Sequence, residues 1–145
     1  RETSIGFLGP WVMGTLALVS GDPERSRKAL KDAEKILAGG CVGHNYIAFY
    51  RLAMEVCLRL EDWDELKRFA GALETYCRPE PLPRAGFYVA RGRALAGYGR
   101  GARDESTLQE LRRLRDEAVR LSLVSALPAL ERALGEGSAC GEARV

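Results

Sequence analysis

The stretch that most constrains the fold is residues 45–83, which read NYIAFYRLAMEVCLRLEDWDELKRFAGALETYCRPEPLP. In its first half the charged side chains are Arg51, Glu55 and Arg59, and helical spacing places them on one narrow stripe while apolar side chains cover the rest. We therefore expect this helix to be contacted on several sides. In the second half apolar residues recur at intervals of three and four, which predicts an amphipathic helix with one solvated face. The stretch predicts a helical hairpin and an all-α fold.

An acidic turn separates the two helices of this hairpin. Asp62 is placed to cap the second helix, and Glu65 stands three residues later as in a capping box. Asp64 and Glu65 also put negative charge at the positive end of the helix dipole. Trp63 is the largest side chain of the first turn, so we expect it to be deeply buried. An acid/base or cation site is the alternative interpretation of these acids, but capping explains them without chemistry.

Similar helix starts recur along the chain. The turns around Asp22-Pro23, Asp62-Trp63 and Asp104-Glu105 are about forty residues apart, which is typical of stacked helix pairs. We predict an α-solenoid of about three stacked antiparallel helix pairs plus a C-terminal capping helix, in a single domain over residues 1–135. The predicted parts are pairs at about 7–39, 44–78 and 83–122, a capping helix at 123–134, and a flexible tail at 136–145.

The turn at Asp62-Trp63, with small residues such as Ala70 after it, loosely matches the tetratricopeptide pattern G-[DN]-[YW]-x-x-A. The spacing here is longer than the roughly thirty-four residues of that repeat. We interpret the chain as lengthened tetratricopeptide-like repeats, with a HEAT-like variant as the alternative.

The first predicted helix, at about residues 7–20, contains no charged residue. A helix of this kind is either buried or covered by a neighbour. Without a cover, side chains such as Trp11, Val12 and Leu16 would be bare. The sequence therefore predicts self-association, as a homodimer, through this helix.

Composition narrows the class of protein. The 145 residues are 46% hydrophobic and 29% charged, which excludes an extended disordered chain, and no apolar run approaches the roughly 20 residues of a membrane span. The formal net charge is +2, with both signs alternating along the chain, so we expect no nucleic acid as partner. The four cysteines form no C-x-x-C pair and no signal peptide opens the chain, which favours a reducing cytoplasm. The first residue is Arg1 instead of Met, so we expect a piece of a longer protein.

Two short motifs have a chemical and a structural interpretation. Cys41 and His44 are spaced like half a metal site, but no second pair completes a zinc shell, and the alternative is that Asn45 caps the following helix. Residues 97–101, GYGRG, resemble a phosphate-binding loop, but they follow a helix and lack the Lys-Ser/Thr end. We predict a glycine-rich turn there. We therefore expect no metal, no cofactor and no catalytic residue in this chain.

One set of charged residues has a functional interpretation. In stacked helix pairs the first helices line the concave face. The candidate interaction groove for a peptide or an acidic segment consists of Arg51, Glu55, Arg59, Arg84 and Arg91. The alternative is a simple solvated face.

Five stretches carry a family resemblance and together cover nearly the whole chain: GPWVMGTLAL at 9–18, GCVGHNYIAFYR at 40–51, DWDE at 62–65, RPEPLPRAGFYVARGRAL at 78–95 and ALPALERAL at 126–134. They resemble the C-terminal tetratricopeptide-like region of large bacterial signalling proteins of the adenylate cyclase type. In that family a cyclase domain and an ATPase module precede the repeats. This chain carries neither the cyclase metal-binding aspartates nor a G-x-x-x-x-G-K-[ST] loop, so the enzymatic label would describe the preceding parts.

The function predicted from the sequence is a non-catalytic interaction and regulatory module. It would bind a protein partner or the upstream domains of its own parent chain. Two alternatives stay open, a structural oligomerisation piece and a helical domain that senses a small ligand.

Overall fold

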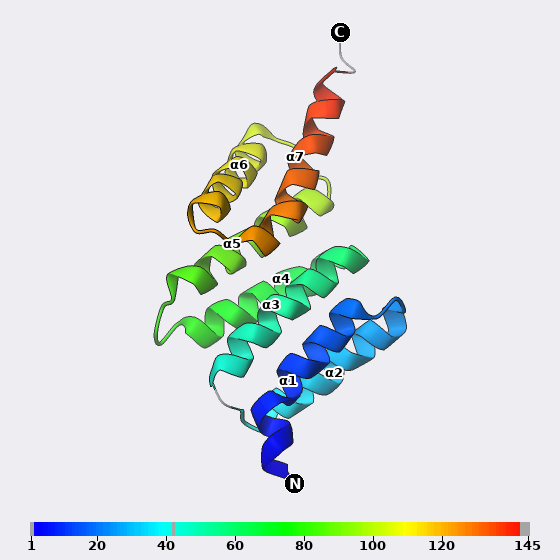
Figure 1. The fold of residues 1–145 in the computed structure, drawn as a ribbon. Helices are drawn as coiled ribbons and strands as arrows, with labels where there is room; N and C mark the ends of the chain where they lie inside the picture. Colours follow the sequence, from blue (N-terminus) through cyan, green and yellow to red (C-terminus); the bar gives the residue numbers. More distant parts are fainter. Residues whose placement is uncertain (1, 42, 143–145) are drawn as a thin grey trace.

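The computed structural model describes the backbone of residues 2–41 and 43–142, and the side chains of residues 8–41 and 43–135. The described backbone forms seven α-helices and one short 3-10 helix, with no strand, so the all-α prediction is confirmed (Figure 1). The elements are α1 Glu2–Val19, α2 Pro23–Ala38, α3 Gly43–Leu60, α4 Trp63–Cys77, α5 Pro83–Gly99, α6 Glu105–Arg120, η1 Val124–Ala126 and α7 Leu127–Glu142.

Three of the helix starts are capped by the predicted aspartates. The Asp22 carboxylate accepts from the backbone N–H of Glu24 at 2.9 Å, and Asp62 accepts from that of Glu65 at 3.3 Å. Asp104 accepts from the backbone N–H of Thr107 at 3.0 Å. Each cap satisfies an N–H group that has no partner inside its helix. These local signals therefore set the starts of α2, α4 and α6.

The predicted cap of α3 is wrong. Asn45 does not precede the helix, because α3 already begins at Gly43, and its side chain is completely buried. The Tyr76 hydroxyl, from the end of α4, donates to the Gly43 carbonyl oxygen at 3.1 Å. The start of α3 thus lies against α4, and Asn45 belongs to the helix interior.

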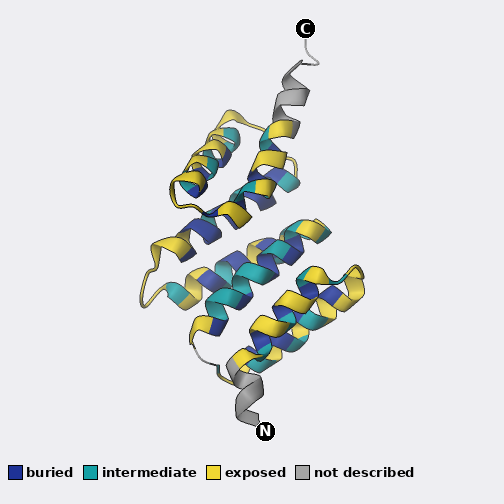
Figure 2. Cartoon of the chain, viewed as in Figure 1, coloured by how far each residue is buried: buried dark blue, intermediate teal, exposed yellow. Residues whose placement is uncertain are grey.

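Each helix packs mainly against its neighbours in the chain. α1 packs along α2 and α3, α4 packs along α3 and α5, and α6 packs against α5 and α7 (Figure 1). α3 contacts four other helices, α1, α2, α4 and α5, which confirms that it is contacted on several sides. α5 packs far more extensively on α4 than on α3. Among the described side chains, α5 and α3 contain more buried residues than the other helices do. Figure 2 shows that buried residues also occur along the other helices.

Two helices are longer than predicted. α1 begins at Glu2 and continues through Pro10, which removes one backbone hydrogen bond without ending the helix. α7 runs to Glu142, although the sequence predicts an end at 134 and a flexible tail at 136–145. The glycines at 135 and 137 lower helix propensity by about 1 kcal/mol each but leave the backbone hydrogen bonds intact. Residues 143–145 of the predicted tail lie outside the described residues.

Trp63 is less buried than predicted. Its side chain is partly buried, at the edge of the core. The indole ring lies directly against Gly99, the last residue of α5, where an added Cβ would come within 2.3 Å of the ring carbon Cε2. The start of α4 therefore fits over the end of α5 only because residue 99 has no side chain.

Candidate interaction surfaces

The structure separates the five residues of the predicted groove. Arg91 is 1% exposed, so the prediction that it lies on an open face is wrong. Its Nε donates to the Ala126 carbonyl oxygen at 3.0 Å and its Nη1 to Glu55 Oε1 at 2.5 Å. A guanidinium is buried at tolerable cost only when it is paired and hydrogen-bonded in this way. Arg91 and Glu55 thus join α5, α3 and the segment that leads into α7.

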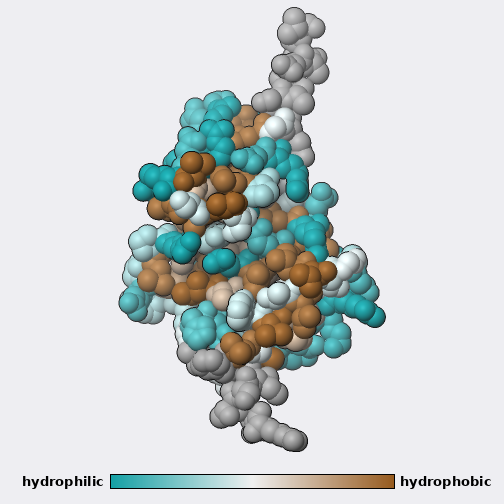
Figure 3. Space-filling model, in the orientation of Figure 1, coloured by the Kyte–Doolittle hydropathy of each residue, from teal (hydrophilic) through white to brown (hydrophobic). Residues whose placement is uncertain are grey.

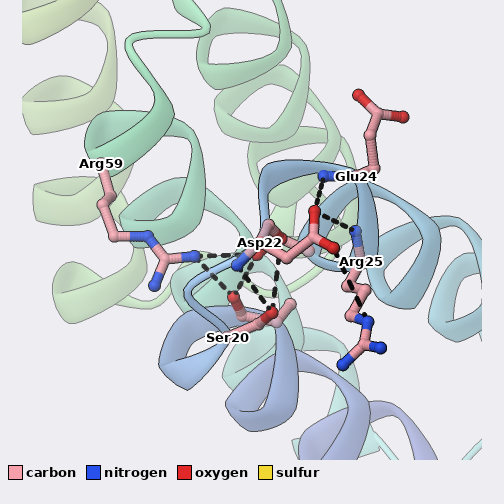
Figure 4. A network of polar contacts seen from close by, with 7 residues as sticks. Ser20, Asp22, Glu24, Arg25 and Arg59 are labelled. Carbon is pink, nitrogen blue, oxygen red and sulfur yellow. Dashed lines mark hydrogen bonds and ion pairs between the residues drawn. The ribbon is translucent and has the colours of Figure 1, made fainter.

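Arg59 closes the end of α1. Figure 4 shows its side chain reaching from α3 toward the turn between α1 and α2, beside Asp22. The guanidinium donates to the carbonyl oxygens of Ala17, at 2.8 Å, and Leu18, and to the Ser26 hydroxyl at 2.9 Å. The last carbonyls of a helix have no partner within it, so these bonds satisfy groups that α1 leaves open. The role of Arg59 is to tie three helices together.

Arg51 and Arg84 are the members of the set that remain open to a partner. Arg51 is partly buried, and its guanidinium carbon lies 4.8 Å from the centroid of the Tyr88 ring, a cation–π contact. Arg84 is exposed near the start of α5. The five residues therefore do not form one continuous charged groove.

The sequence contains an indication of the buried Arg91–Glu55 pair that the spacing of charges along each helix does not reveal. Arg91 is surrounded in the chain by Tyr88, Val89 and Leu95, all of which are buried. Of the three arginines of α5, Arg91 is the one among buried neighbours, and a buried cation requires an anion on a neighbouring helix. Glu55 is the one acidic residue of α3, which made it the natural partner.

An extended apolar surface lies on α1. Its side chains recur at intervals of three and four and so form a single strip, which we name the α1 stripe. Its members, with their exposed fractions, are Leu8 42%, Trp11 50%, Val12 46%, Leu16 53% and Val19 71%. Figure 3 shows hydrophobic side chains over this part of the molecule. The expectation that Trp11, Val12 and Leu16 are bare is thus confirmed.

The opposite side of α1 packs tightly on α3. Ala17 is completely buried, and a Cβ added to Gly14 would lie 3.1 Å from Cδ1 of Leu52. Small residues let the two helices approach closely. The large apolar residues of the α1 stripe lie on the other side, where 42–71% of each remains exposed.

A concave surface lies between α4 and α5. It is a groove of about 680 Å³ whose lining includes Cys77, Leu82 and Val89, with Arg78 and a Glu74–Arg93 ion pair at its edge. The hydrogen bonds from Arg93 hold the pKa of Glu74 below its usual value. Glu74 therefore stays ionised at neutral pH.

The cysteines and acids offer little chemistry. Cys41, Cys57 and Cys77 are free thiols, and burial raises the pKa of Cys57 to about 12. Within the described side chains, no group of three His, Cys, Asp or Glu residues is arranged to hold a metal ion. The glycine-rich segment is the end of α5 and a turn, in which Gly101 has a φ of 106° and donates to the Tyr98 carbonyl oxygen at 2.9 Å.

None of the described helices combines the length and the apolar character needed to cross a bilayer. Comparison of the chain with family models, with curated proteins and with solved structures found no match. The resemblance to the repeat region of adenylate cyclase-type signalling proteins stays a prediction from the sequence.

Proposed function

We propose that this chain is a non-catalytic, helical-repeat interaction module that binds protein through the α1 stripe. The observation that carries the proposal is the exposure of five large apolar side chains in one row on α1. Contiguous apolar patches of this kind are rare on monomeric proteins unless they serve an interaction. The stripe carries no charge, so the partner surface it fits is an apolar helix face.

The packing order supports the repeat interpretation. α1 with α2 and α3 with α4 are neighbouring antiparallel helices, and α1 also packs along α3, as the first helices of successive repeats do. In such an array every internal helix is covered by the next pair, and a terminal helix presents a face that a further pair could cover. The α1 stripe is a face of that kind. The free thiols support a reducing compartment such as the cytoplasm.

A second copy of the chain is the partner that can be tested directly. The chain has two tryptophans, so a Trp63→Phe variant leaves Trp11 as its only indole and as a reporter inside the stripe. We expect the sedimentation-equilibrium mass to rise with concentration and the emission of Trp11 to shift to the blue over the same range.

Leu16→Glu places a charge in the middle of the α1 stripe. It should abolish both the rise of mass with concentration and the blue shift of the Trp11 emission. Val124→Glu is the matched control, since Val124 is 72% exposed and lies in η1, away from the stripe. A chain that stays monomeric at millimolar concentration, with Trp11 emission typical of full solvation, would contradict self-association. Equal behaviour of the two glutamate variants would contradict the role of the stripe.

A further inference from the structure

The groove between α4 and α5 has the size and lining of a small-molecule site. Its volume of about 680 Å³ lies inside the range of roughly 300–1,000 Å³ that is usual for ligand pockets. Its apolar lining includes Cys77, Leu82, Ala85 and Val89. The groove lies outside the α1 stripe and shares no residue with it.

Small residues of α5 keep the groove open. A Cβ added to Gly86 would meet no atom within 4 Å, so the space above this residue is empty. Ala85 and Ala90 continue the same shallow floor. The connection of residues 78–82 contains Pro79 and Pro81, and proline restricts the backbone conformation of this connection between α4 and α5.

The charges around the groove are unevenly matched. Arg93 forms two hydrogen bonds with the Glu74 carboxylate, at 2.9 and 2.7 Å, and the charge of Arg78 also helps to lower the pKa of Glu74. Arg78 forms no ion pair with another residue among those the structure describes. The lining therefore carries one positive charge in excess, at one end of an apolar floor.

We infer that this groove binds an aliphatic monocarboxylate, with its carboxylate on the Arg78 guanidinium and its hydrocarbon chain on the floor between α4 and α5. Arginine can donate two parallel N–H···O bonds to a planar carboxylate, a geometry that no other side chain matches as well. The hydrocarbon chain gains free energy as it leaves water for the apolar lining. An uncharged alcohol of the same length keeps the contact of its hydrocarbon chain with the groove and loses the ion pair with Arg78.

Octanoate and 1-octanol are the probes that separate these two contributions, by isothermal titration calorimetry on the 145-residue chain. We expect saturable binding of one octanoate, with 1-octanol about tenfold weaker, because a hydrogen bond to a charged group contributes roughly a factor of ten or more. Arg78→Gln should weaken octanoate to the level of 1-octanol and leave 1-octanol unchanged. Absence of octanoate binding, or equal affinity for the two probes, would overturn the inference.

A substitution that fills the groove tests the location. Gly86→Leu places a side chain into the empty space without a clash and should abolish octanoate binding while the helix content stays the same. Gly71→Leu is the matched control, because Gly71 also lies within a helix, has no atom near an added Cβ and is not part of the lining. If both variants bind octanoate like the unmodified chain, or both lose it, the site lies elsewhere and the inference is wrong.

Discussion

Arg91 and Glu55 lie 36 positions apart in the chain and are joined by an ion pair of 2.5 Å, in which the arginine side chain is 2% and the glutamate side chain 29% exposed. The same guanidinium also holds the Ala126 carbonyl oxygen. The contact therefore joins three segments that enter the fold at different points of the chain.

Arg91→Met should lower the free energy of unfolding by about 3 kcal/mol. Removal of one partner of a buried pair typically costs about 3–5 kcal/mol, and the partial exposure of Glu55 places this case at the lower end. Urea unfolding followed by circular dichroism measures the change. Arg84→Ala, at an exposed position, should cost less than about 0.5 kcal/mol. The double variant with Glu55→Gln should recover part of the loss, and equal stability of the Arg91 and Arg84 variants would refute the structural role.

Trp63 and Gly99 should behave as a coupled pair. Trp63→Ala should cost about 2 kcal/mol, less than the roughly 3–5 kcal/mol of a fully buried aromatic, because the indole is only partly buried. Gly99→Ala should be destabilising, since its Cβ would collide with the indole at 2.3 Å. In the Trp63→Ala background the same substitution should be neutral or stabilising, because alanine is the better helix former. A double-mutant cycle measures this, and additive effects would show that the two residues are independent.

Acid should destabilise the fold below about pH 5. Hydrogen bonds from basic side chains or from a helix N-terminus lower the pKa of five carboxylates, those of Asp32, Glu65, Glu74, Asp104 and Glu110. A pKa that is lower in the folded than in the unfolded state adds stability above the unfolded value near 4, and that stability is lost as the pH falls through the folded value. We expect the melting temperature to fall between about pH 5 and pH 2.

Asp104→Asn isolates one of these groups. The amide keeps an acceptor for the Thr107 N–H, but it cannot take up a proton, so its melting temperature should fall less with acid than that of the unmodified chain. Asp116→Asn serves as the control, since the carboxylate of Asp116 pairs with Arg115 at the surface and caps no helix. A melting temperature that does not change between pH 6 and pH 3 would contradict the prediction.

The Cys57 thiol should be nearly inert in the folded chain at pH 8. Its pKa of about 12, raised mainly by burial, leaves only about one thiolate in ten thousand at that pH. Iodoacetamide labelling followed by peptide mapping should show Cys77, which is partly buried and lines the α4–α5 groove, modified before Cys57. In urea Cys57 and Cys77 should react with iodoacetamide at similar rates. Rapid labelling of Cys57 without denaturant would mean that the core opens locally.

Local signals predicted the helices well because each depends on a few consecutive residues. The aspartates at 22, 62 and 104 set helix starts through bonds to N–H groups two or three residues away. The absence of charge from residues 7–20 also predicted the exposed stripe of α1, since the row of apolar residues can be recognised in the sequence.

The candidate groove was predicted less well because its members depend on distant segments. Arg91 is buried where its guanidinium meets the Ala126 carbonyl oxygen, 35 positions later in the chain. The periodicity of a single helix cannot predict a contact with such a distant segment. The position of Arg59 likewise depends on where α1 ends. Spacing placed these arginines on a helix face, but only packing decided which of them face another helix and which face solvent.

The bonds of Arg59 to α1 have a consequence for how the chain unfolds. Most contacts here join neighbouring helices, and chains with local contacts fold fast and can lose their ends one unit at a time. Arg59 binds Ala17 across 42 positions, so α1 cannot detach from α3 without exposing carbonyls that this guanidinium satisfies. This one side chain therefore raises the free energy of fraying at the N-terminal end, and it couples the melting of the first helix pair to that of the second.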